Sequence, residues 1–121
     1  MKTYLLILLG SFLGASTRYL IDSQLGGGPK STFLINLSGC FLIGLLFGLI
    51  NDFYGKIFLI IGLLGSFTTF SSYAWGILNL LQRQEYLLAS FYGLGNPALG
   101  LLSCWLGIQA NNFIKFCFTL L

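Results

Sequence analysis

Four long apolar segments, separated by short polar connections, limit what this chain can fold into. They cover approximately residues 3–20, 31–50, 57–81 and 86–108, and each is close to the roughly 20 residues that an α-helix needs to cross a bilayer. Only 7% of the 121 residues are charged, against about 25% in soluble domains. We therefore expect an all-α membrane protein in which residues 1–121 form a single domain of four transmembrane helices, without a separate catalytic module.

The connections between the segments are short and contain helix-breaking or polar residues. Residues 26–29 read GGGP, residues 51–55 read NDFYG, and residues 82–85 read QRQE. Short connections make consecutive helices antiparallel neighbours. The apolar run after Met1 is also typical of a signal peptide. Arg18 and Tyr19 follow it directly, however, and three more apolar segments come later, so we expect it to remain as the first span.

The middle of the third segment predicts a broken helix. Non-helical backbone at membrane depth survives only where it is buried in protein or lines a wet cavity. The glycine and hydroxyl residues that indicate the break are Gly62, Gly65, Ser66, Thr68, Thr69, Ser71 and Ser72. The fourth segment has a similar irregularity at Gly93, Gly95, Asn96 and Pro97. That second irregularity is compatible with a break or with a simple kink.

Several classes of function are disfavoured by what the chain lacks. It contains no histidine, which is the commonest general base and metal ligand, so we do not expect an enzyme. Its net charge of +3 is scattered and forms no basic run, so we expect no nucleic-acid partner. The three cysteines lie in apolar stretches, where cysteine behaves as a small hydrophobic residue; they are Cys40, Cys104 and Cys117.

A proton-coupled exporter is also a weak candidate. Such transporters generally use an acidic residue or histidine inside the membrane, but Asp22, Asp52 and Glu85 all fall in or beside the connections. The small multidrug-resistance exporters also have four short spans, yet they depend on a glutamate in the first one. This chain has Gly10, Ser11 and Ser16 there.

The positive charges do not favour either orientation in the membrane. One side carries Lys2, Lys56 and Lys115, and the other carries Arg18, Lys30 and Arg83. Because orientation normally follows the side richer in Lys and Arg, a balanced chain can insert both ways and form an antiparallel dimer. Two inverted copies would supply eight helices around an axis in the membrane plane. Small residues four apart, as in the pairs Gly10/Gly14 and Gly44/Gly48, predict close helix contacts within the chain or with a partner.

The polar side chains left inside the spans are neutral. Thr32 and Asn36 are four residues apart and share one helix face. The Asn36 amide has two donors, which suits an anion stripped of part of its water, although an asparagine can also simply join two helices. Tyr92 and Asn96, also four apart, would extend such a polar track.

Aromatic rings and one arginine complete the candidate site. Phe70 and Tyr73 are three apart, directly after the expected break. Because the edge of an aromatic ring is positive, ring edges can line an anion path without a full charge. Arg18 ends the first span, where it would attract anions to a mouth or extend to the lipid headgroups.

Three sequence motifs follow one another along essentially the whole chain. Residues 14–19 read GASTRY, residues 32–44 read TFLINLSGCFLIG, and residues 62–73 read GLLGSFTTFSSY. In this order they resemble the motifs GAxxRY, TLxxNxxGxFxxG and GxxGGFTTFSTF of the Fluc (CrcB) fluoride-channel family.

This resemblance implies a passive, fluoride-selective channel of the plasma membrane, built as an antiparallel dimer with two pores, that exports fluoride from the cytoplasm. It implies a structural sodium ion at the dimer interface, held by the backbone carbonyls of Gly65 and Thr68, and a wide vestibule at Arg18. The pore residues that it implies are Asn36, Phe70, Tyr73, Thr32, Ser71, Tyr92 and Asn96.

Three residues depart from the family pattern and keep alternatives open. Ser66 replaces the second glycine of the break, Tyr73 replaces a pore phenylalanine, and Gly76 stands where many members have glutamate. A heterodimer with one impaired pore, or a non-conducting subunit that needs a close homologue, is therefore an alternative to a homodimer. The tail, residues 111–121, is apolar but too short to span, and we expect an interfacial helix there.

Overall fold

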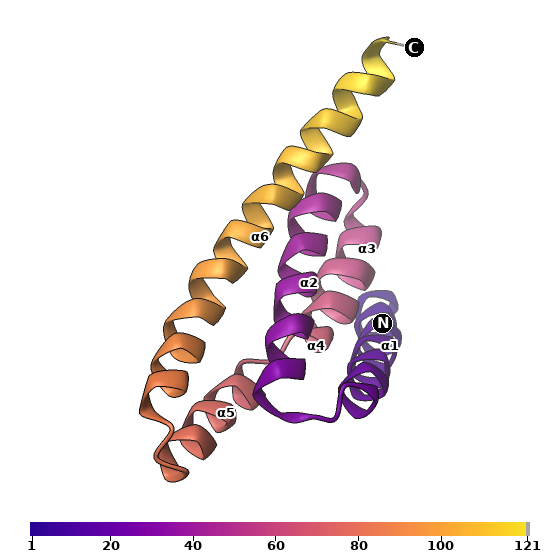
Figure 1. The fold of residues 1–121 in the computed structure, drawn as a ribbon. Helices are drawn as coiled ribbons and strands as arrows, with labels where there is room; N and C mark the ends of the chain where they lie inside the picture. The colour runs from indigo at the N-terminus through magenta and orange to yellow at the C-terminus, as the bar shows by residue number, and fades with distance from the viewer. Residues whose placement is uncertain (121) are drawn as a thin grey trace.

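The computed structural model describes residues 1–120, whose regular elements are all helical. They make four spans that are each long and apolar enough to cross a membrane, which confirms the predicted fold class. The elements are α1 (Lys2–Gln24), α2 (Gly28–Leu49), α3 (Phe53–Gly55), η1 (Lys56–Leu64), α4 (Gly65–Phe67), α5 (Phe70–Gln82) and α6 (Tyr86–Leu120). Figure 1 shows α1, α2 and the α3–α4 region side by side, with α6 packed on the outer side of α2.

The first connection is shorter than the sequence predicts. Helix α1 continues to Gln24 and α2 begins at Gly28, so residues 25–27 alone lie between them. The backbone of Gly26, Gly27 and Gly28 has φ of 81°, 69° and 84°, a region that side chains with a Cβ rarely adopt. Pro29 follows in the first turn of α2, where the N–H that proline lacks would have no helical partner.

The third span is interrupted, as predicted. It starts with the short α3, continues as the π-helix η1 and the single turn α4, and leaves the helical conformation at Thr68 and Thr69. The two threonines have ψ of 153° and 116°, which is extended backbone. Helix α5 then starts from Thr69, whose Oγ1 accepts a 3.2 Å hydrogen bond from the Ser72 N–H. A hydroxyl at this position is a typical N-cap.

The fourth span is one continuous helix. Of the two alternatives for residues 93–97, the structure excludes a break, because α6 continues through Pro97. Its 35 residues are about 52 Å long, against a hydrocarbon core of about 30 Å. The helix is therefore longer than the predicted span 86–108, which stays a prediction. The tail up to Leu120 is not a separate helix as expected, because it prolongs α6 past the end of α2 (Figure 1).

Glycines form two seams inside the chain. A Cβ atom on Gly44 of α2 would collide with the carbonyl oxygen of Cys104 on α6, and one on Gly107 of α6 would collide with that of Phe41. On the other side of the bundle, a Cβ on Gly14 of α1 would collide with a backbone carbonyl of η1. The small-residue spacing thus marks contacts between helices of one subunit, which lets their backbones approach closely.

We predict that Gly44→Ala destabilises the protein by about 2 kcal/mol, because the new methyl group must displace the backbone of α6. Gly95→Ala is the matched control, since no atom lies within 4 Å of its added Cβ, and it should leave stability unchanged or raise it by up to about 1 kcal/mol. Unfolding in detergent micelles by a denaturing detergent measures both free energies. Equal effects of the two substitutions would contradict the assigned seam.

Candidate functional site

The broken third span is held by the side chain of Asn36. Its Nδ2 donates a 3.0 Å hydrogen bond to the Thr69 carbonyl, and its Oδ1 accepts a 2.8 Å bond from the Thr69 N–H. One residue of α2 thereby pairs both backbone groups of a residue that has left the helix. An asparagine amide carries two hydrogens, so one donor of Asn36 remains beyond this pair. The side chain joins two spans and still has a donor to offer.

The break also changes the partners of two backbone carbonyls. In an uninterrupted α-helix the N–H of Thr69 would bond to Gly65, and that of Ser72 would bond to Thr68. Here the Thr69 N–H donates to Asn36, and the Ser72 N–H donates to Thr69 Oγ1. The carbonyls of Gly65 and Thr68 therefore lose their regular helical donors. Carbonyl oxygens in this condition are suitable ligands for a hard cation.

Thr69 is a residue of the site that the sequence marked only as part of the expected break. It is buried, and its Oγ1 lies 3.1 Å from the hydroxyls of both Ser71 and Ser72. The signal was present in the sequence, because threonine is a preferred N-cap residue directly before a helix. What the sequence could not indicate is that its backbone pairs with α2.

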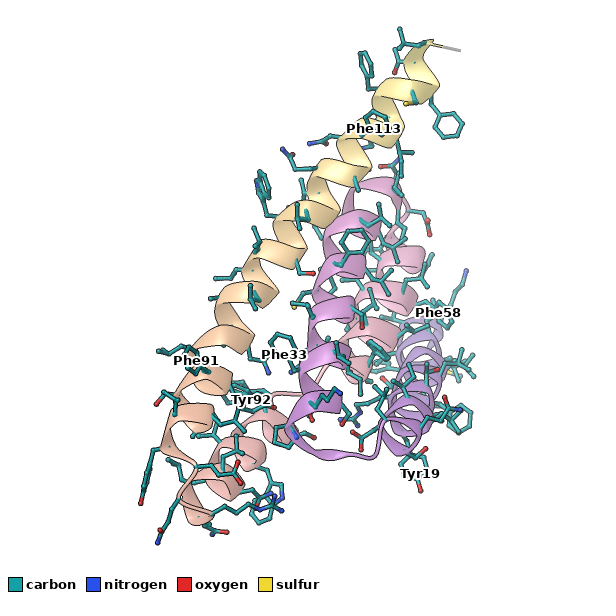
Figure 2. All side chains as sticks on the ribbon, in the orientation of Figure 1. Tyr19, Phe33, Phe58, Phe91, Tyr92 and Phe113 are labelled. Carbon is teal, nitrogen blue, oxygen red and sulfur yellow. The ribbon has the colours of Figure 1, made fainter. Side chains whose placement is uncertain are left out.

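Three aromatic rings form a continuous row. The ring centroids of Phe70 and Tyr73 are 5.4 Å apart, and those of Tyr73 and Tyr92 are also 5.4 Å apart, with the rings tilted in both pairs. Phe70 is 78% exposed and Tyr92 only 8%. The row thus leads from the surface of α5 to its buried contact with α6. In Figure 2, Tyr92 points from α6 towards α2 and α5, whereas the neighbouring Phe91 points outward.

Two buried donors of α6 have no partner among the described residues. The Tyr92 hydroxyl and the Asn96 Nδ2 are inaccessible and make no hydrogen bond. Buried Thr32, on α2, and Asn96, on α6 itself, lie beside the Tyr92 hydroxyl. A buried unpaired donor costs roughly 1–3 kcal/mol, and native proteins rarely retain one without a reason. These two donors can therefore bind a hydrogen-bond acceptor that is not part of the protein.

Arg18 borders a small cavity beside α2 and the break. A cavity of about 240 Å³ is bounded by Arg18, Asp22, Thr32 and Thr69, among others. A second cavity of about 170 Å³ shares Asp22 and Thr32 with it and extends to Gly76. Asp22, expected in or beside the connection, lies in the last turn of α1 and accepts a hydrogen bond from the Ser31 hydroxyl.

The predicted site residues thus fall into two groups. Thr32, Asn36, Tyr73, Tyr92 and Asn96 gather between α2, the break, α5 and α6, with Arg18 at the adjoining cavity. The second group lies at or beside the break. Phe70, Ser71 and Gly65 are exposed on the outer side of the single subunit, and Thr68 is half-buried.

Four apolar spans, an interrupted third span and neutral donors between them define a multi-pass membrane protein, in bacteria one of the cell membrane. Residues 5–108 match the family described as CrcB-like protein, Camphor Resistance (CrcB), and the chain belongs to this family.

Close relatives are similar over almost the whole chain. A protein of Helicobacter acinonychis (strain Sheeba) is 41% identical over 88% of this chain and 93% of its own length. One of Oceanobacillus iheyensis is 37% identical over 95% of both, and one of Flavobacterium psychrophilum is 39% identical over 89% of this chain and 95% of its own. Each of the three is named "Fluoride-specific ion channel FluC". The family is therefore one of ion channels, which are not enzymes.

We predict that Asn36→Leu destabilises the protein by about 2 kcal/mol, because it leaves the N–H and carbonyl of Thr69 unpaired. Hydrogen exchange at the Thr69 amide should accelerate at least about tenfold, the factor that 1.4 kcal/mol represents. Ser38→Ala is the control on the same helix, since that hydroxyl bonds only to its own helix at Ile35. Unchanged exchange at Thr69 in the leucine variant would show that Asn36 does not hold the break.

Proposed function

We propose that this chain forms a passive, fluoride-selective channel that lets fluoride leave the cytoplasm. The observation that carries the proposal is the pair of buried, unpaired donors, the Tyr92 hydroxyl and the Asn96 amide, beside Thr32. Neutral donors can replace part of the water around a small anion without holding it as tightly as a full charge would, and conduction requires both entry and release. The relatives named as fluoride-specific channels support fluoride as the anion.

Passive flow is sufficient for this task. Hydrogen fluoride is a weak acid that crosses membranes uncharged and dissociates inside, so an anion pathway alone relieves the accumulation. Asp22, Asp52 and Glu85 lie at the ends of the spans, whereas proton coupling generally uses an acidic group or a histidine within the membrane. The proton-coupled exporter is accordingly the weaker alternative.

The proposed path begins at Arg18 and runs between the helices. Arg18 attracts the anion into the adjoining cavity, whose wall includes Thr32 and Thr69. The remaining amide hydrogen of Asn36 and the donors of Tyr92 and Asn96 then replace hydrogen bonds that water made to the anion. The positive edges of the row formed by Phe70, Tyr73 and Tyr92 would favour an anion along the same course.

An antiparallel dimer with two pores is part of the proposal. Phe70 and Ser71 are pore candidates, yet both are exposed on a single subunit, and a second copy would cover them. The balance of three positive charges on each side agrees with insertion in both orientations. A close homologue as the second subunit, with this chain non-conducting or with one impaired pore, is the alternative.

A structural sodium ion at the dimer interface also belongs to the proposal. The residues fit such an ion, because the carbonyls of Gly65 and Thr68 have lost their helical donors and hard cations prefer oxygen ligands. The ion would supply positive charge that compensates these carbonyls and would link the broken spans of two subunits.

Efflux from liposomes that contain only this purified chain tests the proposed function. We expect rapid fluoride efflux, with chloride retained, and no dependence on an imposed pH gradient. No efflux from folded, inserted protein would contradict a homomeric channel and favour the obligate-partner alternative. Efflux that required a proton gradient would favour an exporter.

We predict that Tyr92→Phe lowers fluoride efflux at least about tenfold while stability stays the same or rises by up to about 1 kcal/mol. The reason is that the Tyr92 hydroxyl donates a hydrogen bond to the anion during conduction. In the absence of the anion, the same buried hydroxyl is unpaired and lowers the stability of the fold. Efflux per folded protein and detergent-induced unfolding are measured on the same sample. Tyr86→Phe is a control, since that tyrosine is 62% exposed at the start of α6. A large loss of stability in Tyr92→Phe would show that the hydroxyl is structural.

A further inference from the structure

Pro97 leaves one backbone carbonyl of α6 without its regular helical N–H donor. In an α-helix the carbonyl of residue 93 would accept from the N–H of residue 97, but Pro97, inside α6, has no N–H. The ring of a proline in a helix also crowds the carbonyl four residues before it. The Tyr73 hydroxyl donates a 2.6 Å hydrogen bond to this same carbonyl, that of Gly93. The bond crosses from α5 to α6 at the turn that the proline disturbs.

We propose that Tyr73 is a positioning residue, whose hydroxyl supplies the hydrogen bond that Pro97 withholds from Gly93 and thereby holds the donors of α6 towards α2. Its hydroxyl does not serve as a donor to the ion. In this role the tyrosine still presents its ring between Phe70 and Tyr92. Polar groups freed by a proline in a membrane helix need a partner of this kind.

The position of this bond explains why it matters for the site. Tyr92 directly precedes Gly93, and Asn96 directly precedes Pro97. The hydrogen bond from Tyr73 to Gly93 therefore fixes the direction of the helical turn that carries both unpaired donors. Without it, the turn is free to bend away from α5, and the Tyr92 hydroxyl would move relative to Thr32.

Contacts around Tyr92 support the same conclusion. Its ring belongs to a buried cluster with Leu80 and Ala89, against which Tyr73 packs. On the face towards α5, a Cβ atom on Gly76 would lie 3.0 Å from Cε1 of Tyr92 and 3.2 Å from its hydroxyl. Tyr92 thus fits against a bare glycine on α5, and the bond between Tyr73 and Gly93 keeps α5 and α6 at the spacing that this fit requires.

A double-mutant cycle on stability tests the pairing of the hydroxyl with the carbonyl. Tyr73→Phe should lower the folding equilibrium constant of the otherwise unchanged protein about tenfold, by leaving a buried carbonyl unpaired. In the Pro97→Ala background the loss should be less than about twofold, because the alanine introduced at position 97 provides an N–H for Gly93. Equal losses in both backgrounds, or no loss in either, would overturn the pairing.

Fluoride efflux per folded protein tests the positioning role, and this arm alone rests on the proposed function. Tyr73→Phe should lower efflux about fivefold at a temperature where it is folded, although it keeps the aromatic ring. The exposed-tyrosine variant Tyr86→Phe should match the parent. Efflux unchanged in Tyr73→Phe, despite a loss of stability, would overturn the positioning role. If the parent protein shows no efflux, the proposed function fails, and the stability cycle still decides whether Tyr73 pairs with Gly93.

Discussion

The two hydrogen bonds between Asn36 and Thr69 are the interaction on which the rest of the structure depends. Inside a bilayer, a backbone that leaves the helix must find other partners for its polar groups. A single amide side chain meets this need for Thr69, and the third span can therefore stop and restart at membrane depth. The same break releases the carbonyls of Gly65 and Thr68 and starts α5 where Phe70 and Tyr73 follow in its first turns.

The buried polar groups of this bundle divide into those that are paired and those that are not. Asn36, Thr69 and Tyr73 use their hydrogen bonds to stabilise irregular backbone, at the break and beside Pro97. Tyr92 and Asn96 keep donors that nothing in the described chain accepts from. The fold tolerates that cost because its glycine seams and paired groups stabilise the surrounding helices. A site that binds an ion weakly and releases it needs donors of the second kind.

The sequence predicted the features that depend on local composition and could not predict those that depend on distant partners. The four spans and the break followed from apolar length and from clustered glycines and hydroxyls. The exact position of the break at Thr68 and Thr69 depends on Asn36, the partner of Thr69, which is 33 residues away, and no local pattern contains such a pair. Glycine spacing predicted close contacts, but not that Gly44 meets α6 and Gly14 meets η1. A separate helix was expected for the tail because polar residues follow residue 108, whereas neither glycine nor proline follows to stop α6.

Two departures from the family pattern are each accommodated by α6 within this chain. Tyr73 adds a hydroxyl to an aromatic position, but the hydroxyl is bound to Gly93, so the ring edge remains available. Gly76 removes a side chain from α5, and the ring and hydroxyl of Tyr92 lie against the space that results. Both changes therefore belong to one packing solution at the contact between α5 and α6. Neither departure therefore leaves a gap or an unpaired hydroxyl at this contact.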